Sequence, residues 1–372
     1  MYRRFYSFTG AAVFLVMMLA SAYAQTMTQL PDNVPPPGAA SAERPVGVGM
    51  VAAPPANFNP LTASPIAHAR YAIPPAPDAA VAPRAYREWR KAVTGPQIRV
   101  TPVLTQTKIA NGPLKRVGSP VPLANAMNNS VMTSTSINWS GTSVINSNNP
   151  FAVEAVIGEF VVPTARQAFG SCTGGWVFSA QWPGIDGNGS NDVLQAGVEA
   201  DAYCNGGTVA NFYSAWVEWY PSNEVRASSP AIHPGDLIYV QVWNTSPTNG
   251  YAYFFNFSTL EAAEYQLAAP SGTTLVGNSV EWIVESPYVG GGLATLTNYI
   301  SVPWPLGAAL NYTAGQPTYY LAGSNPPAGT LDLITMVDNS NNGISSATVE
   351  NNTFLWFQDF GSACGRSGAP PC

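Results

Sequence analysis

The chain has 372 residues, of which 46% are hydrophobic and only 10% charged, and its formal net charge at pH 7 is −6. Twelve of the fifteen Lys and Arg lie before residue 117 beside four acids, giving +8, whereas three lie after it beside seventeen acids, giving −14. This imbalance argues against nucleic acid as a partner, because the larger, acidic part of the chain would repel phosphate.

Residues 1–24 have the pattern of a secretory signal peptide. Arg3 and Arg4 form a charged start, residues 11–20 form a short apolar run, and Ala22-Tyr23-Ala24 is a small-x-small cleavage site. The apolar run is about half the length that a bilayer span requires, so a membrane anchor is not expected. We predict a secreted protein, extracellular or periplasmic, that does not act at a membrane.

Residues 25–130 are predicted to form a basic propeptide and linker. The first part, 25–83, is rich in Pro and Ala and cannot bury a core. The segment from Arg84 to Lys91 favours a short basic helix with two aromatic residues. A cationic leader on an anionic domain suggests an intramolecular inhibitor that docks electrostatically; the alternative is a solvated basic arm without an inhibitory role.

Residues 131–372 have the composition and residue pattern that are typical of a single all-β domain. Asn, Gly, Ser and Pro recur as turn residues, and the runs between them are short and rich in Val, Ile, Tyr, Phe and Trp, as in 237–243 and 251–257. We expect an antiparallel, jelly-roll-like β-sandwich of two packed curved sheets, monomeric and preceded by a mostly irregular propeptide. Because this part has only three cations, it gains little positive charge when its carboxylates protonate, which predicts stability in acid.

Four cysteines, all in the acidic part, fit the disulfides of an exported protein. Four cysteines allow three pairings. Proximity in sequence favours Cys172 with Cys204 and Cys364 with Cys372. No CxxC pair or neighbouring His suggests metal binding by these thiols.

The acidic part contains one histidine, His233, and no lysine. Two-histidine metal sites and lysine-based nucleophiles are therefore excluded, and neither the surroundings of His233 nor any GxSxG motif supports a serine triad. We predict no metal and no cofactor. Carboxylates remain as the groups for proton transfer, and an ordinary Glu pKa near ~4.3 suits acid chemistry.

Strand periodicity narrows the choice among seventeen carboxylates. In 281–285 the period of two places Glu281 and Glu285 on one face and Trp282 on the other, and if Trp282 packs inward both glutamates reach the wetter face. In the same way Trp216, Glu218 and Tyr220 share a face. A face with Trp and Glu beside small neighbours suits a substrate groove, although a strand glutamate is more commonly just solvated.

Five segments, in order, resemble the glutamic peptidases, also called eqolisins. They are Asn138-Trp139-Ser140-Gly141, Trp182-Pro183-Gly184-Ile185-Asp186-Gly187, Leu194-Gln195-Ala196-Gly197, Ala215-Trp216-Val217-Glu218-Trp219-Tyr220-Pro221 and Glu281-Trp282-Ile283-Val284-Glu285. The chain departs from the family at Ser214, where an Asp is common, and at Pro183, where a larger residue is common. The resemblance is that of a divergent, bacterial-like branch.

The resemblance implies an acid-acting, pepstatin-insensitive endopeptidase that hydrolyses polypeptides with an activated water. The family's catalytic pair falls on Gln195 and Glu285. Its substrate-binding positions fall on Trp139, Trp182, Asp186, Trp216 and Glu218. We expect the two catalytic side chains to come from neighbouring strands and to share one water.

Two other functions fit the same residues. A β-sandwich glycoside hydrolase would use Glu218 and Glu285 as its two carboxylates. A carbohydrate-binding jelly roll would use the aromatic face and would have no need of Gln195.

Overall fold

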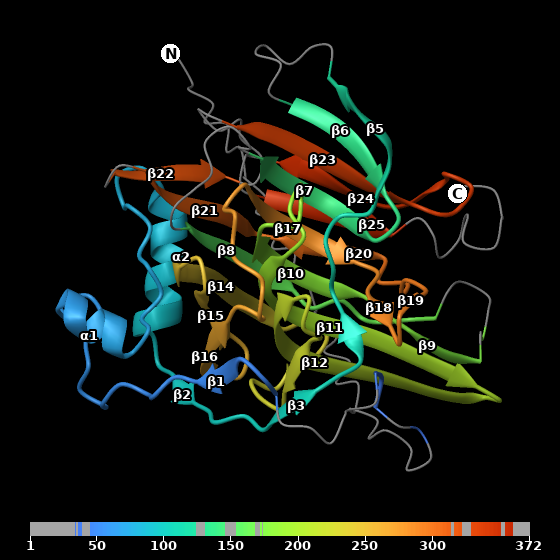
Figure 1. Cartoon of the computed structure of the whole chain (residues 1–372). Helices are drawn as coiled ribbons and strands as arrows, with labels where there is room; N and C mark the ends of the chain where they lie inside the picture. Colours follow the sequence, from blue (N-terminus) through green and yellow to red (C-terminus); the bar gives the residue numbers. More distant parts are fainter. Residues whose placement is uncertain are drawn as a thin grey trace, which may run out of the picture.

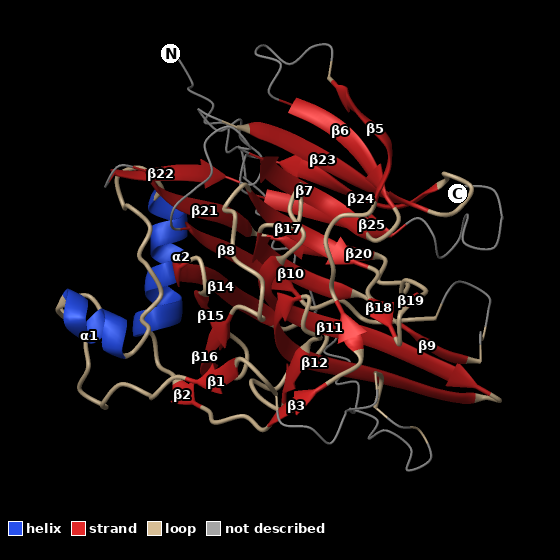
Figure 2. Cartoon of the chain, viewed as in Figure 1, coloured by secondary structure: helices blue, strands red, loops and turns tan. Residues whose placement is uncertain are grey.

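The computed structural model describes residues 34, 36–38, 45–123, 131–145, 154–167, 172, 174–313, 316–321, 329–350 and 354–359. The described chain is dominated by β-strands, with two helices at one side (Figures 1 and 2). The predicted signal peptide and Cys364–Cys372 pairing lie outside these residues. No helix in the described ranges is long and apolar enough to cross a membrane.

The larger sheet has fourteen strands in the described chain and is mainly antiparallel. Its main path, in spatial order, runs β20 (Ser301–Trp304), β25 (Phe354–Asp359), β24 (Gly343–Glu350), β23 (Thr330–Val337), β7 (Trp139–Ile145), β17 (Ser279–Glu285), β10 (Ala180–Ile185), β11 (Val193–Asn205), β12 (Thr208–Tyr220), β13 (Val225–Ala227) and β3 (Leu104–Gln106). Off this path, β6 (Val131–Ser136) pairs with β23 and β5 (Arg116–Pro122), and β9 (Gly175–Val177) pairs with β11.

The smaller sheet has eight described strands and packs against one face of the larger one. Its path runs β1 (Val48–Met50), β16 (Glu261–Ala268), β15 (Asn249–Asn256), β14 (Leu237–Ser246), β8 (Glu154–Val161), β21 (Leu306–Thr313) and β22 (Gln316–Leu321), with β2 (Ile98–Arg99) beside β16. A separate three-stranded sheet joins β19 (Gly292–Leu293), β18 (Tyr288–Val289) and β4 (Ile109–Ala110).

The main core lies between the two large sheets. Alternate residues of β14 and β8, such as Val240 and Phe160, meet alternate residues of β12 and β17, such as Val217 and Trp282. The Trp282 indole donates to the carbonyl of Ile157 on the facing sheet at 2.8 Å. The predicted β-sandwich is confirmed, and Trp282 packs inward as the alternation required.

The described part of the leader, 45–123, is more ordered than expected, since it contains two helices and five short strands. Helix α2 (Pro83–Thr94) confirms the predicted basic helix, and α1 (Pro65–Arg70) precedes it. Helix α2 lies against the outer face of the smaller sheet (Figure 1). Its Trp89, only 2% exposed, packs with Ala92 and with aromatic residues of β14 and β15.

A disulfide joins Cys172 and Cys204, which confirms one of the two favoured pairings. Their Cα atoms are 5.3 Å apart. Since Cys204 lies near the end of the long strand β11, the bridge ties a preceding segment to the end of the β11–β12 hairpin.

Candidate active site

Three adjacent strands in the middle of the larger sheet carry the predicted catalytic pair. Gln195 lies on β11 and Glu285 on β17, with β10 between them, so the expectation of neighbouring strands was wrong. Because Leu194 and Val284 point into the main core, the pleat directs Gln195 and Glu285 to the opposite face. Both side chains are fully buried rather than facing water.

The Glu285 carboxylate accepts three hydrogen bonds. The side-chain amide of Asn138 donates to Oε1 at 3.2 Å, the Trp182 indole donates to Oε2 at 3.1 Å, and the backbone N–H of Gly112 donates to Oε1 at 3.2 Å. Complete burial raises the pKa of Glu285 well above its ordinary value, and these donors oppose the rise. Such a carboxyl can gain and lose a proton without leaving its place.

Gln195 and Glu218 lie side by side on paired strands. They are directly opposite in the β11–β12 register, and the Gln195 amide nitrogen lies 3.4 Å from Glu218 Oε2. The same amide nitrogen donates to the carbonyl oxygen of Asn111 in the leader. Burial is the main cause that raises the pKa of Glu218 well above the ordinary range, and the nearby charges of Glu224 and then Glu285 add to it.

Three predicted substrate-binding tryptophans form one cluster on this face. Trp139, Trp182 and Trp216 are fully buried, and Trp139 and Trp182 meet edge to face with centroids 5.0 Å apart. Leu114 of the leader and Tyr220 pack against the cluster. The prediction that Trp216, Glu218 and Tyr220 share a face is in agreement with this arrangement.

Asp186 is placed differently from the other predicted site residues. Its two carboxylate oxygens accept from the backbone N–H groups of Val276, Gly277 and Asn278 at 2.7, 2.9 and 2.8 Å. Asp186 has a φ of 69°, at the turn that follows β10. The structure therefore gives Asp186 the position of a loop anchor and does not bring its carboxylate to Gln195 or Glu285.

A leader segment lies across the face that carries these residues. Strand β4 pairs with β18, and Asn111 and Gly112, which follow β4, are buried against Gln195, Glu218 and Glu285. Asn111 donates to Glu218 Oε2 from its backbone at 3.0 Å and from its side chain at 3.1 Å. The leader thus covers the candidate site directly.

A second group of carboxyls lies farther along the same face. Glu199, Asp201 and Glu224 are fully buried, and Arg226 Nη2 is 3.8 Å from Glu224 Oε1. Burial raises the pKa of Asp201 to about 8, while burial and then the charge of Asp201 raise the pKa of Glu199 well above its usual value. These groups are therefore expected to hold protons in acid and near neutrality.

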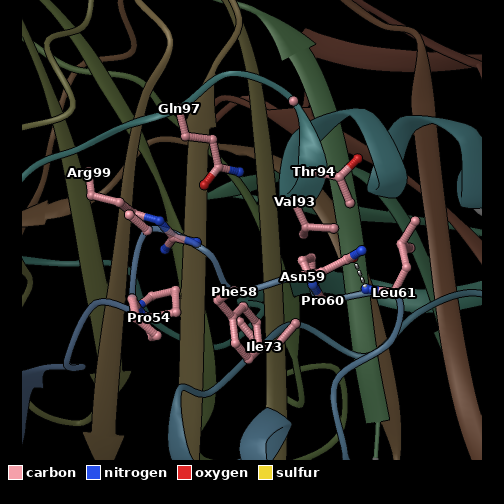
Figure 3. Close-up of a pocket in the computed structure, with 13 residues that line it drawn as sticks. Pro54, Phe58, Asn59, Pro60, Leu61, Ile73, Val93, Thr94, Gln97 and Arg99 are labelled. Atoms are coloured by element: carbon pink, nitrogen blue, oxygen red, sulfur yellow. Dashed lines mark hydrogen bonds between the residues drawn. The ribbon is translucent and has the colours of Figure 1, made fainter.

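Two pockets help to locate the site. One, of about 440 Å³, is lined by leader residues between Pro54 and Arg99 (Figure 3), and neither Gln195 nor Glu285 is among the residues that line it. The other, of about 490 Å³, is lined by Gly112, Tyr220 and Tyr288 among others and opens beside Glu285's leader contact. No group of three or more His, Cys, Asp or Glu side chains in the described ranges is arranged to hold a metal ion.

Asn138 is the site residue to which sequence reasoning assigned no role. Its amide nitrogen contacts Glu285, and its amide oxygen accepts from the backbone N–H of Lys115 at 2.9 Å. The sequence could have pointed to Asn138, because it is the first residue of the first of the five segments that resemble the glutamic peptidases.

The model of the peptidase A4 family matches residues 137–355. A search of curated protein sequences found no match.

The fold is similar to those of several solved structures. Scytalido-glutamic peptidase, in complex with a peptide-based transition-state analog, is 23% identical, with 60% of this chain and 98% of that chain covered and a TM-score of 0.46. SCP-B, a member of the eqolisin family in complex with the tripeptide Ala-Ile-His, is 23% identical over 60% and 98%, with a TM-score of 0.44. Aspergilloglutamic peptidase from Aspergillus niger is 24% identical over 49% and 99%, with a TM-score of 0.41.

Proposed function

The chain belongs to the peptidase A4 family and is a glutamic endopeptidase, and from this premise we propose that it cuts polypeptides with Gln195 and Glu285 and is secreted as an inactive precursor. The observation that carries the proposal is that a single peptide group of the leader bonds to both side chains. Membership in a peptidase family also decides against the two carbohydrate functions considered from the sequence.

In the proposed mechanism, Glu285 acts as general base and then as general acid. It takes a proton from a water that attacks the carbonyl carbon of the scissile peptide bond, and it returns that proton to the leaving nitrogen. Asn138 and Trp182 fix the carboxyl by donating to its two oxygens. Burial raises the pKa of Glu285, so in acid only the ionised fraction of the enzyme can take the proton from water, whereas the protonated carboxyl readily donates to the leaving nitrogen.

Gln195 is proposed to stabilise the oxyanion. Its amide nitrogen donates to a carbonyl oxygen, and the same donor can strengthen its bond as negative charge develops there. Gln195 Oε1 has no hydrogen-bond partner among the described residues, which leaves it to accept from the attacking water. An amide keeps its donor and its acceptor at any working pH, unlike a histidine.

The leader is proposed to act as an intramolecular inhibitor. This is supported by the complete burial of Gln195 and Glu285 and by the contacts of Asn111 and Gly112 with them. Secretion is supported by the signal-peptide pattern of residues 1–24, and action in acid by the shortage of cations after residue 116.

The test is an assay of the acidified full-length protein on denatured haemoglobin or casein, in parallel with polysaccharides. We expect proteolysis that survives pepstatin and inhibitors of serine, cysteine and metallopeptidases, with no release of sugars. Polysaccharide turnover without proteolysis would contradict the proposal.

A further inference from the structure

One peptide bond of the leader lies between the two proposed catalytic side chains. The Gln195 amide nitrogen donates to the carbonyl oxygen of Asn111, and the N–H of Gly112 donates to Glu285 Oε1 at 3.2 Å. These two leader atoms belong to the same peptide group. The carbonyl oxygen of Asn111 therefore contacts Gln195, the proposed oxyanion donor. The nitrogen of Gly112, which would be the leaving group, contacts Glu285, the proposed general acid.

The chain on both sides of this bond is held against the peptidase domain. Before it, β4 pairs antiparallel with β18, and the backbone N–H and side chain of Asn111 bond to Glu218. After it, the N–H of Leu114 donates to the carbonyl of Gly187 at 3.1 Å, and Lys115 bonds to Asn138. Contacts on both flanks fix the bond's position, as productive substrate binding requires.

The residue after the bond must be small. A Cβ on Gly112 would lie 3.2 Å from Cε2 of the Tyr220 ring, closer than ordinary contact. Glycine therefore allows the amide nitrogen to approach Glu285. The pocket of about 490 Å³ that Gly112 and Tyr220 help to line gives solvent a route to the bond.

We propose that the enzyme cuts its own chain between Asn111 and Gly112, and that this is the first cut in its activation. The inference rests on the proposed function. Water adds to the Asn111 carbonyl carbon and gives a proton to Glu285; the C–N bond breaks, and that proton passes to the Gly112 nitrogen. The products are a carboxyl group on Asn111 and an amino group on Gly112, and only water is consumed.

A basic pair nearby, Lys115-Arg116, is a weaker candidate. The Lys115 carbonyl accepts from the N–H of Ile137 at 3.0 Å, and Arg116 pairs with Asp332 at 3.1 Å. These contacts hold Lys115 and Arg116 beside β6 and β23, so their bond is not presented to Gln195. After a cut at Asn111–Gly112, strand β5 would remain in the larger sheet, whereas α2 would belong to the released fragment.

The test is to purify the full-length chain near neutral pH, shift it to acid and sample early times by intact mass and amino-terminal sequencing. We expect the first new amino terminus at Gly112 and the matching leader fragment ending at Asn111. Because the bond is already bound in its own groove, the fraction cut per minute should not change on tenfold dilution. A first cut elsewhere, or a rate that falls in proportion to dilution, overturns the inference.

An external substrate in the same samples separates this inference from the proposed function. If the protein hydrolyses denatured casein but first cuts itself at another bond, the proposed peptidase function stands and only the proposed cleavage site is wrong. If it cuts neither casein nor its own chain, both the cleavage site and the peptidase function are contradicted.

Three variants test the geometry of the bond. Gly112→Pro removes the N–H that contacts Glu285 and should abolish the cut at this bond, slowing activation at least about tenfold. Gly112→Ala should slow the cut but keep its position, since the Tyr220 ring has to shift only slightly. Ser119→Ala, at an exposed position of β5 away from the bond, is the control and should leave the first cut unchanged.

A Gly112→Pro chain that activates at the wild-type rate would overturn the proposal. Thermal unfolding of each intact variant checks its fold, and the position of the cut in Gly112→Ala remains decisive if the proline chain does not fold.

Discussion

The side-chain amide of Gln195 donates to a peptide carbonyl oxygen from a fully buried position. Because a donor aimed at an oxyanion is commonly worth ~10²–10³ in turnover, Gln195→Ala should lower kcat by about that factor. KM should change less, since the leader's flanking contacts indicate that strand pairing and Glu218 bind the substrate backbone.

This prediction is checked by initial rates on a peptide substrate, after the leader has been cut by immobilised wild-type enzyme that is then filtered off. Gln266→Ala, at an exposed position in β16, is the matched control and should keep its rate. A Gln195→Ala enzyme with an unchanged kcat would remove Gln195 from the mechanism.

Part of the site could be predicted from residue patterns alone. Alternation within strands correctly placed Glu218, Trp216 and Tyr220 on one face and separated Glu285 from Trp282. It could not give the contacts of Asn138, because they depend on which strands pair. The complete burial of the face was also missed, since it comes from a leader segment more than eighty residues before Gln195 in the chain.

At the scale of elements, the sandwich strands were predictable and most leader strands were not. The sandwich strands combine β-branched and aromatic residues with turn residues at their ends. Strands β2 and β3 have two and three residues, and each forms only because it pairs with an existing strand, β16 or β13. Helix α2 was predictable, but the sequence suggested that its charges hold it, whereas its apolar face packs on the sheet.

The docking of α2 is therefore expected to depend on Trp89 more than on its arginines. Trp89→Ala removes a buried ring and its indole bond to the Pro74 carbonyl, and it should destabilise the intact precursor by about 3–5 kcal/mol. Arg87→Ala, at an exposed position of the same helix, should change stability by less than about 0.5 kcal/mol.

Denaturant unfolding of both variants near neutral pH, with the precursor uncut, is the measurement. If Arg87→Ala lowered the free energy of unfolding more than Trp89→Ala does, charge attraction rather than apolar packing would hold α2 on the sheet.

At the scale of the whole molecule, buried carboxyls set the response to pH. Burial raises the pKa of Asp201 and of Glu264 to about 8 and that of Glu159 to about 7. A carboxyl with a raised pKa contributes its stability below its unfolded pKa and loses it as pH rises through its folded pKa. The fold should therefore be most stable below about pH 4 and should weaken steadily up to about pH 8.

The measurement is the thermal unfolding midpoint as a function of pH, made on Glu285→Gln protein to prevent self-cutting. Asp201→Asn, which removes one of these titrations, should flatten the upper part of the profile. A midpoint that rises from acid to about pH 8 would contradict the assignment.

Buried carboxyls also affect how the leader is released from the candidate site. Protonation in acid favours burial of Glu218 and Glu285 beneath the leader, because burial raises the pKa of both. At these two residues acid therefore does not loosen the leader. Cutting the chain, rather than loss of charge attraction, is the step expected to open the groove.

The central claim is that Glu285 moves the proton during peptide hydrolysis. The most direct test compares Glu285→Gln with the wild type on denatured haemoglobin in acid, both freed of the leader by immobilised wild-type enzyme that is then removed. Because Gln preserves the shape but cannot transfer the proton, we predict that activity falls by about 10²–10⁴. Activity near the wild-type level in the Glu285→Gln enzyme would contradict the account.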